Sequence, residues 1–264
     1  MNKTGEEPIL SLPERHNRIL ALLQQFGSIS VAQLAERFKV SEVTIRKDLS
    51  YLEQQKKLYR THGSAILISP YISDRHVKEK EKRNVAEKRA IGAFAASLIA
   101  QDDSIIIASG TTVTFLAREI NPAGHLTAIT ASVPVTQILS QCPDVDVIQL
   151  GGITRSSSVS VVGPFAEQML RSFNCSKLFI GVDGIDTEFG LTTTNMLEAS
   201  LNGAMIDAAQ KVIVLADSSK FGRRGFSKIC DLESVDRIIT DSGVQSVYLD
   251  RLRERGIEVT VVDV

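Results

Sequence analysis

The sequence predicts a two-domain α/β protein, in which a small N-terminal domain of helices and a hairpin precedes a larger domain with a mostly parallel sheet. Three observations support this prediction. The chain has 264 residues, which is more than one small domain needs. Short helical patterns fill its first quarter. From Ala90 onward, aliphatic runs alternate with helical patterns, as in sheets that are covered by helices on both faces.

The first predicted helix lies upstream of residue 27. Ile19, Leu22, Leu23 and Phe26 recur at helical spacing and can close a small core. Gly27 is placed to end the helix, because glycine readily adopts the left-handed conformation that follows many helices.

Two capped helices follow, joined by a very short connection. Ser30 and Gln33 have the spacing of a capping box, and apolar residues then recur at helical spacing. Ser41 can cap the next helix, because its hydroxyl accepts a hydrogen bond from an N–H of the first turn. In that helix Ile45 and Leu49 share one buried face. Two helices joined so tightly form a helix-turn-helix, whose second helix enters the major groove of DNA.

Residues 57–67 predict two short strands around a turn at His62 and Gly63. Three helices and this hairpin make a winged helix-turn-helix over residues 14–68. Residues 1–64 hold ten Lys or Arg and seven Asp or Glu, a net charge of +3, whereas the whole chain carries −1. The positive charge is therefore confined to the end that is predicted to bind DNA.

The outer face of the helix that begins after Ser41 carries cationic, hydroxyl and amide groups, which suit phosphates and base edges. Taken alone, this segment fits an ordinary solvated helix face equally well. The capped helix before it and the hairpin after it favour DNA recognition. The residues predicted to contact DNA are Val43, Thr44, Arg46, Lys47, Ser50 and Tyr51, with Arg60 and His62 from the wing.

The flanking segments differ in composition from both domains. Residues 1–13 are expected to be a flexible N-terminus, and residues 69–86, with a dense charge run at 78–83, a solvated linker. The N-terminus lacks the layout of a signal peptide, and no apolar run reaches the ~20 residues of a membrane span. Three cysteines without CxxC spacing indicate reduced thiols. We therefore expect a cytoplasmic protein without membrane contact, metal or cofactor.

Residues 87–264 predict an open, largely parallel sheet with intervening helices. Helical patterns occupy 113–120, 133–141 and 247–255. In such sheets a ligand binds outside the carboxyl ends of the strands. The predicted strands are 104–108, 126–130, 145–150, 177–182, 211–216, 237–240 and 257–262.

Glycines and polar residues cluster where these strands end. Residues 109–112, with the sequence Ser-Gly-Thr-Thr, open a helix, where backbone N–H groups and the helix dipole favour a phosphate. An ordinary capped helix fits this segment equally well. Repetition of such ends favours a site for a phosphorylated sugar, with cations on the phosphate and carboxylates accepting from hydroxyls. The predicted effector-binding residues are Ser109, Gly110, Thr111, Thr112, Gly151, Gly152, Arg155, Asp183, Glu198, Asp217 and Lys220.

Several ordered motifs occur in both parts of the chain. They are Arg15, Ile19, Leu23, Ser41, 44–49 and 60–65 in the first domain, and 87–91, 109–112, 151–152, 179–184, 190–193 and 217–221 in the second. These motifs resemble the DeoR family of bacterial transcription regulators, over about residues 14–264. The resemblance implies an effector domain like the sugar-phosphate isomerase fold, and hence binding of a phosphorylated sugar. Residues 195–205 look most like members that respond to amino-sugar catabolism.

Three positions depart from the family pattern. Ser64 replaces the second glycine of the wing motif, which a turn tolerates. Ala108 stands where the family has Asp, and Ala131 where it has Asn. The last two changes remove hydrogen-bonding groups from the expected pocket, so the identity of the sugar stays open.

The resemblance implies a transcriptional repressor of a sugar operon, an amino-sugar operon being one case. Its partners would be double-stranded operator DNA and a phosphorylated-sugar effector. Symmetric regulators read two half-sites, so a homo-oligomer, either dimer or tetramer, is expected.

Two other functions fit parts of the sequence. The first is a sugar-phosphate isomerase or amino-sugar deaminase with an appended winged helix. It needs a general base such as Asp183, Asp186 or Glu198, but no acid–histidine pairing stands out around His125, so no catalytic residue is assigned. The second is a winged helix that binds only protein, which predicts no salt-dependent DNA binding.

Overall fold

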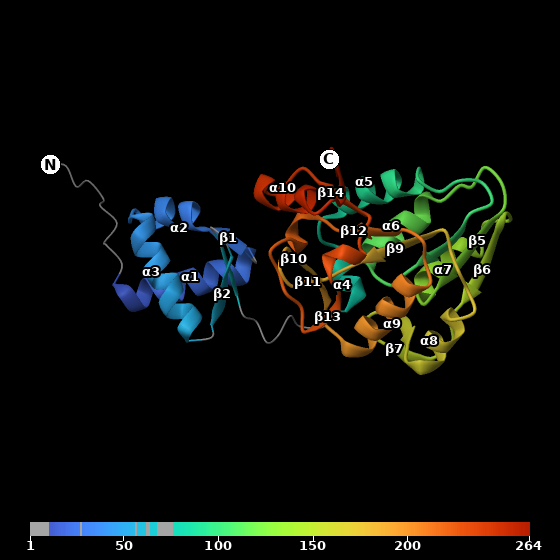
Figure 1. Cartoon of the computed structure of the whole chain (residues 1–264), viewed down its shortest axis with the longest axis horizontal. Helices are drawn as coiled ribbons and strands as arrows, with labels where there is room; N and C mark the ends of the chain where they lie inside the picture. The colour runs from blue at the N-terminus through green and yellow to red at the C-terminus, as the bar shows by residue number, and fades with distance from the viewer. Residues whose placement is uncertain (1–10, 27, 56, 62–63, 68–75) are drawn as a thin grey trace. The chain divides into compact units, whose positions relative to one another are not determined.

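The computed structural model describes residues 11–26, 28–55, 57–61, 64–67 and 76–264. The chain divides into two compact units, residues 1–70 and 71–264. Figure 1 labels most of their helices and strands. Within the described ranges, no helix combines the length and the apolar composition that crossing a membrane requires.

The N-terminal unit contains three helices and a three-stranded antiparallel sheet of order β1-β3-β2. The predicted helices and both hairpin strands are confirmed, while Gly27 and the turn at 62–63 lie outside the described residues. Strand β1 was not predicted; its Ile29 is buried and pairs with Ala65 of the hairpin. The elements are α1 (Leu12–Phe26), β1 (Ser28–Ser30), α2 (Val31–Phe38), α3 (Glu42–Gln54), β2 (Leu58–Thr61) and β3 (Ser64–Leu67).

The predicted helix caps are present. The Gln33 N–H donates to Ser30 Oγ at 3.1 Å, and the Gln33 side chain accepts from the Ser30 N–H at 3.0 Å. Helix α2 ends at Lys39, whose φ of 55° reverses the chain. The Thr44 N–H then donates to Ser41 Oγ at 3.2 Å. These local bonds set the tight connection between α2 and α3.

A buried ion pair joins α1 to α3 inside this unit. The Arg15 guanidinium donates twice to Asp48, through Nε at 2.6 Å and Nη2 at 3.0 Å. This hydrogen bonding outweighs the burial and raises the pKa of Arg15. His16 Nε2 lies 3.2 Å from the same carboxylate. Around the pair, Ile45 and Leu49 are fully buried, as their spacing predicted.

The C-terminal unit is built on seven parallel strands of order β15-β14-β12-β9-β4-β5-β6. All seven correspond to predicted strands. The chain winds in one direction from β4 and in the other from β9, so a switch point lies between these neighbours. The strands are β4 (Ser104–Ile107), β5 (Leu126–Thr130), β6 (Val145–Gln149), β9 (Lys177–Gly181), β12 (Val212–Leu215), β14 (Arg237–Asp241) and β15 (Glu258–Val262).

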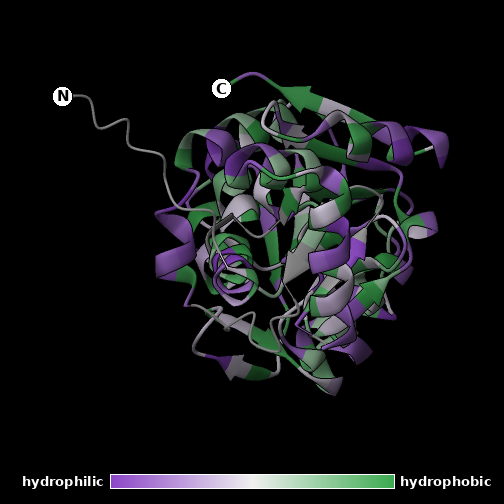
Figure 2. Cartoon of the chain, turned by 90° about the vertical axis from the view of Figure 1, so that its left-hand side faces the viewer, coloured by the Kyte–Doolittle hydropathy of each residue, from purple (hydrophilic) through white to green (hydrophobic). Residues whose placement is uncertain are grey.

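Helices cover both faces of this sheet. Ile105 and Ile107 point into a core shared with α5, α6 and α7, while Ile106 points into a second core shared with α8, α9 and α10. In Figure 2 the sheet strands are largely green and the helices carry purple segments. Helices α6, α7 and α10 match predicted patterns. The helices are α4 (Val77–Glu81), α5 (Val85–Ala96), α6 (Thr111–Glu119), α7 (Val133–Leu139), α8 (Pro164–Leu170), α9 (Met196–Asp207) and α10 (Ser246–Glu254).

Two small antiparallel sheets extend from the carboxyl ends of the large one, and neither was predicted. The first is the hairpin of β7 (Ile153–Arg155) and β8 (Ser160–Val162). The second has the order β10-β11-β13 and consists of β10 (Gly184–Asp186), β11 (Gly190–Thr193) and β13 (Ser227–Cys230). A short 3-10 turn, Ser218–Lys220, follows β12.

Candidate functional site

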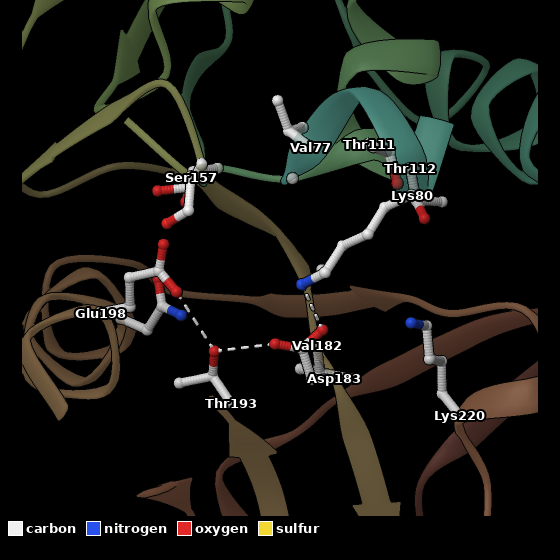
Figure 3. A pocket seen from close by; sticks show the side chains of 15 residues that line it. Val77, Lys80, Thr111, Thr112, Ser157, Val182, Asp183, Thr193, Glu198 and Lys220 are labelled. Carbon is white, nitrogen blue, oxygen red and sulfur yellow. Dashed lines mark hydrogen bonds and ion pairs between the residues drawn. The ribbon is translucent and has the colours of Figure 1, made fainter. Parts of the chain in front are cut away.

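A pocket opens at the carboxyl ends of β4 and β9, at the switch point of the sheet. Its walls come from segments far apart in the sequence, including α4, the start of α6, the β7–β8 turn, β11, α9 and the 3-10 turn after β12 (Figure 3). The lining residues are Val77, Lys80, Ser109, Gly110, Thr111, Thr112, Ser157, Ser158, Gly181, Val182, Asp183, Thr193, Glu198, Asn202 and Lys220.

The start of α6 forms one wall with the character of an anion cradle. Gly110 caps the helix with a φ of 132°, a conformation that side chains rarely adopt. The Gly110 carbonyl accepts from the Thr114 N–H at 3.1 Å, which begins the helical ladder. The N–H groups of Thr111 and Thr112 precede that ladder, so they have no partner within the helix. They and the adjacent hydroxyls can therefore donate to a bound anion.

Asp183 is the central carboxylate of the pocket. Its Oδ1 accepts from Lys80 Nζ at 2.9 Å, and its Oδ2 accepts from the hydroxyls of Thr193 at 3.1 Å and Thr194 at 3.3 Å. Burial alone would raise its pKa. The charges of Lys80 and Lys220, with these hydrogen bonds, outweigh the burial and hold the pKa of Asp183 below its ordinary value. The carboxylate is therefore ionised at neutral pH.

Lys220 is the second cation of the pocket. Its ammonium makes no hydrogen bond or ion pair with any residue in the described part of the chain. Burial lowers the pKa of Lys220, and the charges of Asp183 and Asp217 oppose that shift only in part. A half-buried ammonium without a close partner is a cation that an incoming anion can pair with.

A second carboxylate faces the pocket from α9. Glu198 is buried, and its Oε2 lies 3.2 Å from Arg155 Nη1 and 3.4 Å from the Thr193 hydroxyl. Arg155 also donates to Ser157 Oγ at 2.9 Å. The Asn202 side chain lines the same wall. This side of the pocket thus offers acceptors and hydroxyls rather than an unpaired cation.

The pocket brings together most of the residues that the sequence predicted to bind the effector. Arg155 forms an ion pair with Glu198 but does not line the pocket. Asp217 does not line it either; its carboxylate accepts from Asn84 Nδ2 at 2.8 Å and from the Ser219 N–H at 3.1 Å. The predicted residues that do line it are Ser109, Gly110, Thr111, Thr112, Asp183, Glu198 and Lys220.

Gly151 and Gly152 lie outside the pocket. They follow β6, which is separated from β4 by β5, so this strand end is not at the switch point. Gly152 instead lies so close to the Val162 carbonyl that a Cβ there would be 2.6 Å from its oxygen. Ala108 and Ala131, where the chain departs from the family pattern, are buried and are also absent from the lining.

The contribution of α4 to the pocket was not predicted from the sequence. Val77 and Lys80 come from the segment that was predicted to be a solvated linker. Ser157, Ser158 and Asn202 were not predicted either. A run of charged residues is typical of a solvent-exposed helix, so the sequence does not distinguish Lys80 from its neighbours. The contact with Asp183 identifies Lys80 as part of the site.

The exposed face of α3 carries the residues that were predicted to contact DNA. The side chains of Val43 and Tyr51 are 59% and 51% exposed. Lys47 is exposed, and the described residues offer it no hydrogen bond or ion pair. Arg46 instead pairs with Glu42 at 2.6 Å on the helix surface.

The other predicted DNA contacts are tied to neighbours. The ring of Tyr51 stacks on His16, with centroids 5.1 Å apart. Arg60 of β2 donates to the Ser50 hydroxyl, which itself donates to the Arg46 carbonyl at 2.7 Å. Thr44 Oγ1 lies 2.9 Å from Ser41 Oγ. His62 lies outside the described residues.

The acid–histidine pair of the C-terminal unit lies away from the pocket. His125 Nε2 is 3.3 Å from Asp146, and both side chains are exposed. They lie at the amino ends of β5 and β6, whereas the pocket is at the carboxyl ends of the strands. This pair therefore offers no general base to a ligand in the pocket.

Comparisons with known proteins agree for both units. The model of the DeoR-like helix-turn-helix domain matches residues 15–71, and that of the DeoR C terminal sensor domain matches residues 83–242. The HTH-type transcriptional regulator YulB of Bacillus subtilis (strain 168) is 39% identical, over 94% of this chain and 96% of its own length.

Two further relatives are named as repressors. The HTH-type transcriptional repressor GlcR of Bacillus subtilis (strain 168) is 34% identical, over 95% of this chain and 96% of its own length. The lactose phosphotransferase system repressor of Streptococcus mutans is 36% identical, over 86% of this chain and 91% of its own length.

A solved structure, ribose 5 phosphate isomerase A from Neisseria gonorrhoeae, aligns with 52% of this chain and 53% of its own. Its identity to this chain is 17% and the TM-score is 0.36. The family assignment rests on the two family models and on the near full-length relatives. The chain belongs to the DeoR family, and it is a transcriptional regulator rather than an enzyme.

Proposed function

We propose that this regulator represses a sugar-utilisation operon and that a phosphorylated sugar, bound in the C-terminal pocket, lowers its affinity for the operator. One observation carries the proposal. A single pocket in the sensor domain combines the anion cradle at Ser109–Thr112, the unpaired ammonium of Lys220 and two carboxylates.

These groups suit the two ends of a sugar phosphate. Backbone N–H groups at the start of α6 and the Lys220 ammonium would hold the phosphate through charge-assisted hydrogen bonds. Asp183 is held ionised by its cationic neighbours, so its oxygens can accept hydrogen bonds from sugar hydroxyls. Glu198 and Asn202 offer further acceptors on the opposite wall. A neutral sugar would leave the cradle without a partner.

The DNA-binding role falls to α3. Its exposed face would enter the major groove, with Lys47 and Arg46 near phosphates or base edges and Arg60 of the wing near the backbone. Because such proteins read two half-sites, the regulator would act as a homo-oligomer in the cytoplasm. The name of one relative, the lactose phosphotransferase system repressor, supports a sugar operon as the target.

The effector must distinguish strongly between two states of the protein. Moving an operator from almost fully bound to almost fully free requires the ligand to favour the low-affinity state by about 5.5 kcal/mol. Charge-assisted contacts to a buried phosphate can supply energies of this order, because each is worth about 1.5–3 kcal/mol.

A mobility-shift titration tests the proposal. The full-length protein is bound to the DNA upstream of its own operon, and hexose, hexosamine and pentose phosphates are added, with the unphosphorylated sugars as matched controls. We expect at least one phosphorylated sugar to release the DNA while its unphosphorylated form does not. Release by the neutral sugar at the same concentration, or by no sugar phosphate, would count against the proposal.

A further inference from the structure

Helix α4 forms a wall of the pocket and is also the first described element after the segment that joins the two units. Residues 68–75 separate it from β3 of the N-terminal unit. Val77 and Lys80 of α4 both line the pocket, and the Val77 N–H donates to the Ser157 carbonyl at 2.7 Å. A ligand in the pocket therefore lies beside the stretch of chain that leads to the DNA-binding domain.

Two attachments hold α4 from outside the pocket. The Lys88 ammonium, which is almost fully buried, donates to the Lys80 carbonyl at 2.6 Å and also to the Arg83 carbonyl. On the surface, Glu81 pairs with Arg118 of α6 at 2.6 Å. The side chains that make these contacts, those of Lys88, Glu81 and Arg118, do not line the pocket, so a ligand would leave both contacts in place.

Two further attachments of α4 lie inside the pocket, namely the Val77–Ser157 backbone hydrogen bond and an ion pair of Lys80. The Lys80 side chain reaches from α4 to the Asp183 carboxylate, 2.9 Å away (Figure 3). Asp183 also interacts electrostatically with Lys220, so one carboxylate serves two cations. An anion bound at the α6 cradle brings further negative charge, and Lys80 is a cation within the same pocket that it can recruit. The Val77–Ser157 bond joins uncharged backbone groups, whereas the Lys80–Asp183 pair joins charged side chains. Among these attachments, the Lys80–Asp183 pair is therefore the one that an anionic ligand competes for directly.

We propose that Lys80 is an effector-binding residue and that its ion pair with Asp183 is the latch through which the pocket signals along α4 to the DNA-binding unit. In the free protein, Asp183 holds Lys80 and fixes α4. A bound phosphorylated sugar takes over the ammonium, so α4 loses its contact with Asp183 and can shift about the attachments that remain. The inference extends the proposed function, because it assigns the regulatory step to one ion pair of the same pocket.

The test uses three variants of the full-length protein. Lys80→Gln and Asp183→Asn each break the latch with little change in shape. Glu81→Gln is the matched control, because it breaks the exposed pair on the same short helix. Operator affinity is measured without ligand and with the most effective sugar phosphate of the titration above, and thermal unfolding confirms that each variant is folded.

We expect both latch variants to bind the operator about tenfold more weakly than the wild type without any ligand, a typical size for coupling between sites. Added sugar phosphate should change their operator affinity less than twofold. Glu81→Gln should match the wild type in both respects.

The ligand-free comparison separates this inference from the proposed effector class. If no sugar phosphate acts on the wild type but Asp183→Asn still weakens operator binding, the effector class is wrong and the latch stands. Unchanged operator affinity in folded Asp183→Asn would overturn the latch. The latch would also be overturned if the sugar phosphate released Lys80→Gln from the operator as fully as it releases the wild type. An equal loss of operator affinity in Glu81→Gln would overturn it too.

Discussion

The two units of the chain use their charged residues in opposite ways. In the N-terminal unit the buried charges, Arg15 and Asp48, pair with each other in the core, while Lys47 on the proposed DNA-binding face is exposed. In the C-terminal unit the charges proposed to act on the ligand, Asp183 and Lys220, lie together in a pocket. Paired and unpaired charges therefore lie in different parts of the first unit, whereas in the second the Lys80–Asp183 pair and Lys220 line one pocket.

The partners explain this difference. DNA presents its phosphates along an extended surface, so exposed cations can reach them without losing much of their own hydration. A sugar phosphate is small and must be enclosed to be recognised, which places the charges that bind it in a pocket, where opposite charges compensate one another in part before the ligand arrives. Substitutions in each unit can test whether the separation holds.

The largest effect is expected for Arg15→Ala. It leaves the Asp48 carboxylate buried without its bidentate partner, and breaking a buried pair in this way costs about 3–5 kcal/mol. Thermal unfolding should show an early transition of the N-terminal unit. A mobility-shift assay should show loss of operator binding. Stabilisation of the remaining unit by the effector should persist.

The matched control for the unfolding measurement is Arg46→Gln. It breaks the exposed pair with Glu42, and such pairs contribute no more than about 1 kcal/mol. A wild-type unfolding curve for Arg15→Ala would show that the buried pair is not needed for the fold of this unit.

The next effect concerns pH and the buried Lys88. Burial lowers its pKa to about 8 in the folded protein, although the charge of Asp217 opposes the shift. Above pH 8 the unfolded chain binds a proton that the folded protein does not, so the contribution of Lys88 to stability rises with pH. The rise should approach roughly 3 kcal/mol by pH 10.5, at about 1.4 kcal/mol per pKa unit.

Lys88→Met isolates this contribution from the other groups that titrate at high pH. Chemical denaturation of both proteins gives the difference in unfolding free energy, wild type minus variant, at each pH. We expect that difference to become more positive from pH 8 upward. A difference that stays level would contradict a depressed pKa for Lys88.

A smaller effect is expected for Lys47→Ala on the exposed face of α3. Operator binding should weaken about tenfold, which is ~1.4 kcal/mol, and the slope of its salt dependence should fall by about 1. The unfolding temperature and the stabilisation by the effector should not change, because Lys47 has no partner in the described structure. If the variant lost both operator binding and stabilisation by the effector, or lost neither, the assignment of these two functions to different units would be wrong.

The two units also differ in how much of their functional part could be predicted from the sequence, because local features can be predicted and long-range contacts cannot. The caps at Ser30 and Ser41 depend on neighbours within three residues, so their spacing alone predicts them. The seven central strands are aliphatic on both faces and were all predicted. Strand β1 was missed, because three residues are too few to show a pattern.

The pocket was harder to predict because its members meet only in the folded chain. Asp183 and Lys220 follow strand ends, where polar residues in a parallel sheet converge. Lys80 reaches Asp183 across 103 positions of sequence, and its charge run resembles solvent-exposed helix. Gly151 and Gly152 also follow a strand end, but the strand order places that end away from the switch point. Strand order was not predicted from the sequence.

The most direct test of the account is an operator titration of Lys220→Met with the effector. The substitution removes the unpaired cation of the pocket and keeps an apolar stem of similar length. We predict wild-type operator affinity without effector and at least a thirtyfold higher effector concentration for release, a loss of ~2 kcal/mol that is typical when one buried charge of a contact is removed. Release at the wild-type concentration, or failure to bind the operator without effector, would contradict the assignment of sensing to this pocket.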